Sequence, residues 1–167
     1  IDAGPPSPAE VRRVDFPSPS RPDSETFYLV YLPEGYANSG RTYPVMFFYV
    51  GSGEIETSED ALRRHGPFRT IRDNEGVAPR GYGMEDMMFV VNNQPVANSN
   101  NTDVVLGWEV VERVRATFRV DSSQMFTTGV SMGGNGAHSM VLAHPGVFAA
   151  AIPVSAANRR LSVADAC

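Results

Sequence analysis

The chain has 167 residues, of which 42% are hydrophobic and 20% are charged, and its formal net charge is −5. This length suits one domain with a substantial core. The negative charge and the scattered arginines argue against nucleic-acid binding, and the apolar runs are too short to span a membrane. The absence of lysine excludes phosphate-binding and Schiff-base lysines.

Residues 1–22 contain six prolines among serines, arginines and aspartates. Proline has no backbone N–H and a fixed φ, so this composition predicts an extended linker or an edge segment rather than a helix. Residues 23–167 are expected to belong to one folded domain. A proline-rich start at Ile1 is typical of an exported protein after signal removal, which predicts a secreted or periplasmic location. A disordered cytoplasmic tail is the alternative.

Short apolar runs alternate with helical patterns along the rest of the chain. In chain order, we predict strands at 26–32 and 43–50, a helix at 57–72, a loop at 73–84 and a strand at 87–91. We then predict a helix at 103–118 capped by Asn101 or Thr102, a turn at 120–123, a strand at 125–130, a helix at 132–143 and a strand at 148–154. Continuous apolar strands that alternate with helices predict a mostly parallel, three-layer α/β sheet.

The segment Gly129-Val130-Ser131-Met132-Gly133 matches the pattern G-x-S-x-G. It lies where a buried strand meets a helix, which is the setting of a nucleophile elbow. The glycines Gly129 and Gly133 lack the Cβ that would clash in so tight a turn. Ser131 is therefore predicted to be a catalytic nucleophile, and the N–H of Met132 to stabilise an oxyanion. An ordinary glycine-rich turn is the alternative.

A second glycine-rich segment follows the predicted strand at 43–50. In a hydrolase, a loop at this place supplies the other N–H group of the oxyanion hole. Gly51 or Ser52 is the predicted donor, and a plain turn at the end of the strand is the alternative.

The segment Gln124–Ala157 resembles the elbow region of secreted bacterial esterases, the α/β-hydrolase group with feruloyl esterases and poly(3-hydroxybutyrate) depolymerases. It contains their Gly-x-Ser-Met-Gly-Gly, a helix ending in His-Pro, and a strand near Ala-Ala-x-x-Pro. Tyr28–Glu54 resembles their early strands. The resemblance implies a serine hydrolase that cleaves carboxylic esters through an acyl-serine intermediate, without cofactor or metal. Its substrate would be a small-molecule or polysaccharide-linked ester.

Two features depart from this family pattern. Val50 stands where the family's oxyanion loop usually begins with histidine. The family's catalytic acid and histidine follow the elbow, whereas after Ser131 this chain offers only His138, His144 and Asp165. The resemblance therefore implies that both partners lie beyond residue 167 and that residues 23–167 are the N-terminal portion of an α/β-hydrolase domain whose sheet is incomplete at its C-terminal side.

The histidines of the chain are poor candidates for the missing base. His138 is two helical turns past Ser131, about 10 Å along the axis, and His144 is expected at the end of that helix. A role for His65 would contradict the family's chain order. The three histidines also lack the spacing of a metal site.

Other interpretations stay open at this point. The same scaffold supports acyltransferases and serine peptidases, and the chain could be an inactive fragment or one chain of a split enzyme. The run 148–154 is apolar throughout, so it is predicted to be covered on both faces. As the last strand of a sheet, it would attract a complementary C-terminal segment or a second copy of the chain.

Overall fold

The computed structural model describes residues 5–55, 58–95 and 102–156. Its strands are β1 (Glu10–Asp15), β2 (Phe27–Leu32), β3 (Tyr43–Tyr49), β4 (Met88–Asn92), β5 (Val120–Val130) and β6 (Ala150–Val154). Its helices are α1 (Glu59–Leu62), α2 (Gly66–Asp73), α3 (Val104–Thr117) and α4 (Met132–Ala143), and a 3₁₀ turn, η1, spans Ser52–Glu54. None of the described helices is long and apolar enough to cross a membrane.

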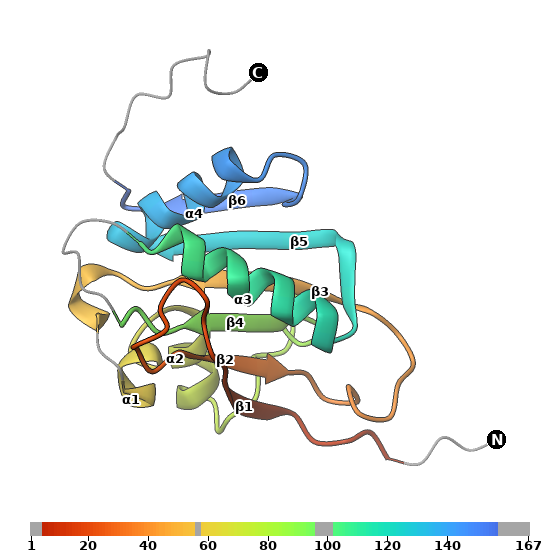
Figure 1. Cartoon of the computed structure of the whole chain (residues 1–167). Helices are drawn as coiled ribbons and strands as arrows, with labels where there is room; N and C mark the ends of the chain where they lie inside the picture. Colours follow the sequence, from red (N-terminus) through yellow and green to blue (C-terminus); the bar gives the residue numbers. More distant parts are fainter. Residues whose placement is uncertain (1–4, 56–57, 96–101, 157–167) are drawn as a thin grey trace.

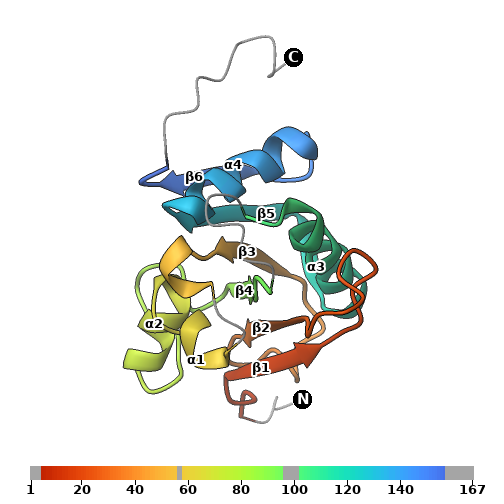
Figure 2. The same cartoon turned by 60° about the vertical axis from the view of Figure 1, so that its left-hand side comes forward.

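The strands form one mixed sheet in the order β1-β2-β4-β3-β5-β6 (Figure 1). The pairs β3–β4, β3–β5 and β5–β6 are parallel, whereas β1–β2 and β2–β4 are antiparallel. Helices α1 and α2 cover one face of the sheet, and α3 and α4 lie on the other (Figure 2). This arrangement confirms the predicted three-layer α/β fold. β1, which belongs to the proline-rich start, lies at the edge of the described sheet.

β2 shows how the sheet divides the core. All six of its residues are buried, and successive side chains of a strand point to opposite faces. Tyr28, Val30 and Leu32 join the apolar cluster under α3 and α4. Phe27, Leu29 and Tyr31 join the cluster under α1 and α2. A strand buried on both faces reads as a continuous apolar run, which is why the sequence shows no alternation here.

The predicted turn at 120–123 is wrong, because these residues belong to β5. The register with β3 jumps from Tyr43↔Val120 to Val45↔Met125, so the extra residues of β5 form an irregularity in the ladder. The Asp121 side chain accepts a hydrogen bond from Ser123 N at 2.9 Å. This local bond is typical of turns, and it explains the turn-like composition within a strand.

Two helix predictions need correction. The expected helix at 57–72 is two helices, because Gly66 has φ +61 and begins α2 close to the Phe48 ring, 2.5 Å from where a Cβ would lie. The N-cap of α3 is Asp103, whose side chain accepts from Leu106 N at 3.1 Å, and not Thr102. The other predicted cap, Asn101, lies outside the described residues.

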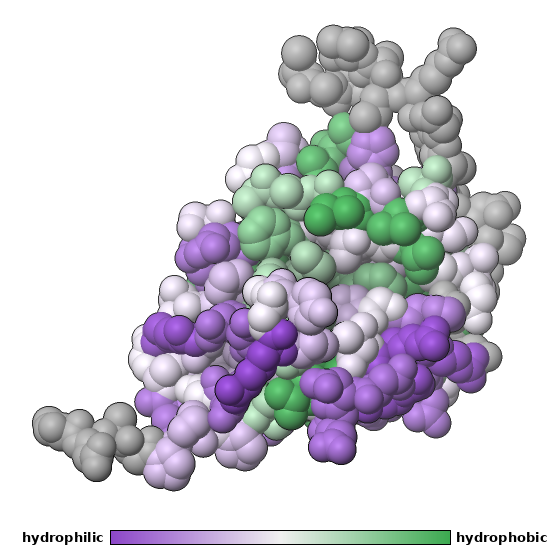
Figure 3. Space-filling model, turned by 180° about the vertical axis from the view of Figure 1, so that it is seen from behind, coloured by the Kyte–Doolittle hydropathy of each residue, from purple (hydrophilic) through white to green (hydrophobic). Residues whose placement is uncertain are grey.

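β6 is largely exposed within the described part of the chain, since four of its five residues are exposed, contrary to the expectation that both of its faces are covered. Its register with β5 places Ala150, Ile152 and Val154 beside alternate residues of β5 on the face away from α4. Ile152 is 56% exposed and Val154 is 47% exposed. Figure 3 shows apolar side chains gathered in the upper part of this side of the molecule.

We expect the 167-residue chain to self-associate through β6, because its outer edge leaves backbone N–H and C=O groups unpaired and this face leaves apolar side chains in contact with water. Ile152→Lys should shift the sample toward monomer in size-exclusion chromatography with light scattering. Val105→Lys is the control, since Val105 is similarly exposed, at 59%, but lies on α3. A monomeric parent chain at high concentration would contradict this expectation.

Candidate active site

Ser131 occupies the single residue between the end of β5 and the start of α4. Its φ of 55° and ψ of −116° are unusual for a residue with a side chain, and such strain costs about 1–3 kcal/mol. Ser131 N donates to Val154 O at 2.9 Å, and Ser131 O accepts from Asn135 N at 3.2 Å. These bonds hold the strained turn, while the serine itself is exposed.

The elbow glycines are required by close backbone contacts. A Cβ at Gly129 would lie 2.3 Å from the carbonyl oxygen of Gly133, and a Cβ at Gly133 would lie 1.9 Å from that of Tyr49. The sequence predicted that the turn is too tight for side chains at these two positions. The structure adds that the end of β3 is the surface against which the elbow is pressed.

The predicted oxyanion donors lie, like Ser131, at the carboxyl ends of the parallel strands. Tyr49 is paired with Gly129 in parallel register, so Gly51 follows β3 at the level at which Ser131 follows β5. Gly51 is buried and precedes η1, whereas Ser52 is exposed. Met132 is the first residue of α4, where backbone N–H groups lack partners within the helix. Their role as oxyanion donors stays a prediction.

One residue close to these strand ends was missed as part of the site. The sequence suggested Thr102 only as a helix cap, but its Oγ1 donates to the carbonyl oxygen of Met132 at 3.1 Å. The contact depends on how α3 packs against α4, and no local sequence pattern indicates such packing.

The histidines of the chain lie in other places. His144 is the C-cap of α4, as expected for a residue at the helix end, and its ring stacks on Trp108 with centroids 3.5 Å apart. His138 lies on α4, seven residues past Ser131, which is about 10 Å along the helix axis. His65 caps α2 in the layer on the opposite face of the sheet. Asp165 lies outside the described residues.

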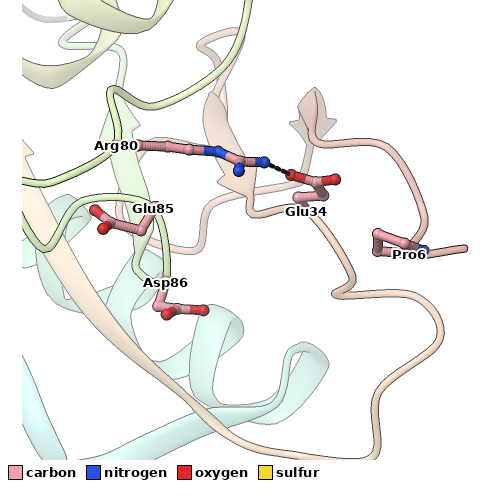
Figure 4. A pocket seen from close by; sticks show the side chains of 5 residues that line it. All are labelled: Pro6, Glu34, Arg80, Glu85 and Asp86. Atoms are coloured by element: carbon pink, nitrogen blue, oxygen red, sulfur yellow. Dashed lines mark hydrogen bonds and ion pairs between the residues drawn. The ribbon is translucent and has the colours of Figure 1, made fainter.

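A cavity of about 430 Å³ opens at the opposite ends of the strands (Figure 4). It is lined by Pro6, Glu34, Arg80, Glu85 and Asp86. Arg80 pairs with Glu34 at 2.7 Å, and Asp86 pairs with Arg41. Pro6 precedes β1, Glu34 follows β2, and the other three residues precede β4, so the cavity lies at the amino ends of the parallel strands, away from Ser131. Within the described ranges, no cluster of histidine, cysteine and acidic side chains could hold a metal ion.

This three-layer sheet, with a strained serine between a central strand and its following helix, defines an α/β-hydrolase fold. The chain belongs to the esterase family, whose model matches residues 20–162. No curated protein matches the chain.

Solved structures of three hydrolases are similar to this chain. A thermostable esterase superposes with a TM-score of 0.69 at 22% identity. The match covers 86% of this chain and 40% of the esterase chain. An S-formylglutathione hydrolase from Staphylococcus aureus has a TM-score of 0.64 at 18% identity, and the match covers 90% of this chain and 59% of the hydrolase chain. A ferulic acid esterase has a TM-score of 0.58 at 20% identity, and the match covers 90% of this chain and 61% of the esterase chain. The likeness shows the fold, and this chain spans between 40% and 61% of the length of these structures.

We expect Gly133→Ala to destabilise the fold strongly, because the added Cβ would meet the main-chain carbonyl of Tyr49 rather than a mobile side chain. Overpacking a dense site costs about 1–3 kcal/mol, and urea unfolding measures it. Gly40→Ala is the control, since no atom lies within 4 Å of its Cβ position. Equal stability of the two variants would show that the elbow can move away from β3.

The stacked pair of His144 and Trp108 predicts a pH dependence of stability. Burial lowers the pKa of His144 below its usual 6.5, while the charge of Glu112 opposes this shift. In the pH range just below 6.5, the unfolded chain binds the proton more readily than the folded chain, so folding stability falls as the pH falls. Urea unfolding should therefore show that the free energy of unfolding falls less between pH 7.5 and pH 5 in His144→Gln than in the parent. An identical dependence of the unfolding free energy on pH in the two proteins would contradict the prediction.

Proposed function

We propose that this chain carries the nucleophile of a serine hydrolase that cleaves carboxylic esters, with Ser131 as the attacking residue. The observation that carries the proposal is the conformation of Ser131, which is exposed at positive φ between β5 and α4. A fold retains such strain where the surrounding structure imposes it, and strained residues cluster at functional sites. The esterase family match supports the same reaction class.

The proposed reaction proceeds in two steps. Ser131 Oγ attacks the ester carbonyl while a histidine accepts its proton, and the negative charge on the carbonyl oxygen is stabilised by N–H groups of Met132 and of Gly51 or Ser52. The histidine then gives the proton to the leaving alcohol, which leaves an acyl-serine. A water molecule, deprotonated by the same histidine, releases the acid and regenerates Ser131. No step needs a metal or an organic cofactor.

We propose that the histidine and its acid partner are supplied from outside residues 1–167, either by a following segment or by a second chain. Two observations support this. His138 and His144 lie along α4, away from the serine that begins it, and His65 belongs to the opposite helix layer. The resemblance to secreted bacterial esterases also implies it, since their acid and histidine follow the elbow.

The finer grouping is a proposal as well. Gly-x-Ser-Met-Gly-Gly and the His-Pro at the end of α4 are similar to secreted feruloyl esterases and poly(3-hydroxybutyrate) depolymerases, and a ferulic acid esterase is among the similar structures. We therefore propose a small-molecule or polysaccharide-linked ester as substrate. We also propose a secreted or periplasmic location, which the resemblance to secreted esterases supports.

A fluorophosphonate probe should label Ser131 in the intact enzyme, because the probe reacts with an activated serine. Ser131→Ala should abolish labelling, as measured by in-gel fluorescence and peptide mass spectrometry. Ser155→Ala is a matched control, since Ser155 is also exposed at positive φ, 50°, close to the elbow. Labelling that persists in Ser131→Ala would refute the assignment.

A further inference from the structure

The segment just before α3 contacts the first turn of α4 at the residue that would bind the oxyanion. Thr102 Oγ1 donates a hydrogen bond to the carbonyl oxygen of Met132 at 3.1 Å. Thr102 is only 6% exposed, so water competes little for this bond. We propose that Thr102 is a positioning residue that fixes the direction of the Met132 N–H. This inference rests on the proposed esterase function.

The helix α4 leaves room for this contact. A Cβ at Gly136 would lie 2.2 Å from Thr102 Oγ1 and 2.5 Å from Thr102 Cβ. Glycine weakens a helix interior, and here its lack of a side chain lets the threonine reach the carbonyl of Met132. The two residues therefore act together: the missing side chain of Gly136 leaves a gap in the surface of α4, and the hydroxyl of Thr102 occupies it.

Thr102 is itself held in place through its neighbour Asp103. Asp103 N donates to Gln94 Oε1 at 2.8 Å, just past the end of β4. The Asp103 carboxylate accepts from Leu106 N at 3.1 Å and pairs with Arg21 at 2.6 Å. Arg21 lies in the loop between β1 and β2, which runs beside α3 in both views (Figures 1 and 2). The position of the Thr102 hydroxyl is thus fixed by three segments: the end of β4, the first turn of α3 and the loop between β1 and β2.

The chemical effect follows from the geometry of one residue. The carbonyl and the N–H of Met132 flank the same Cα, so a bond that fixes the carbonyl restricts the rotations that aim the N–H. An oxyanion donor stabilises the transition state only when it points to the developing charge. Since that charge is absent from the bound substrate, a loosened donor lowers kcat and leaves KM nearly unchanged.

The test compares Thr102→Val, which keeps the shape but removes the hydroxyl, with Thr102→Ser, which keeps the hydroxyl. In the intact enzyme acting on p-nitrophenyl acetate, we expect Thr102→Val to lower kcat about tenfold per titrated active site, less than the 10²–10³-fold of losing a donor outright. Thr102→Ser should retain most of kcat, and KM should stay within about twofold in both variants. Thr117→Val, at the exposed far end of α3, is the control.

A second measurement does not depend on turnover. In the chain labelled with ¹⁵N-methionine, the amide signal of Met132 is identified by its loss in Met132→Leu. Thr102→Val should shift this signal and speed its hydrogen exchange, whereas Thr102→Ser and Thr117→Val should not. Gly136→Ala should reproduce the shift, because its Cβ displaces the threonine.

The two measurements separate the two proposals. If the parent enzyme turns over and Thr102→Val keeps its kcat, or if kcat and the Met132 signal respond equally to Thr102→Ser, the positioning role is wrong. If the parent enzyme shows no Ser131-dependent activity, the esterase function is wrong, and an unchanged Met132 signal in Thr102→Val then overturns the positioning role separately.

Discussion

The carbonyl oxygen of Tyr49 lies where any side chain at position 133 would have to stand, 1.9 Å from its Cβ position. This contact joins the last residue of β3 to the first turn of α4, so the loop after β3 cannot move independently of the elbow. The loop contains Gly51 and Ser52, and the elbow contains Ser131. One steric constraint between main-chain atoms therefore keeps the proposed nucleophile beside the loop that contains the proposed oxyanion donors Gly51 and Ser52.

The same contact explains how the fold tolerates a strained serine. Ser131 in isolation would relax from its positive φ, at a gain of about 1–3 kcal/mol. It is prevented by contacts on two sides, since β3 presses on Gly133 and β6 receives the N–H of Ser131 through Val154 O. The strain is maintained by strands far apart in the sequence, which is the usual arrangement at sites where geometry determines reactivity.

The sequence predicted most of the fold because its signals are local. A buried strand that ends in Gly-Val, followed by a serine and a helix, predicts the turn at Ser131 and the limits of α4 from the chain itself, while the catalytic role of Ser131 stays a prediction. The failures concern contacts between distant segments. The irregularity of β5 at 120–123 depends on its register with β3, the break between α1 and α2 depends on the ring of Phe48 beneath Gly66, and the bond from Thr102 depends on the docking of two helices.

The bond from Ser131 N to Val154 O connects the proposed nucleophile to β6, the strand at the border of the described sheet. Border strands open by local fluctuation at a lower free-energy cost than central strands do. When β6 separates from β5, the elbow loses one of the contacts that keep its backbone in the strained conformation, while β2, β3 and β4 stay folded. Within residues 1–167, the strained geometry of Ser131 is therefore a property of a subglobal unit, which mild denaturant would open before β2, β3 and β4 unfold.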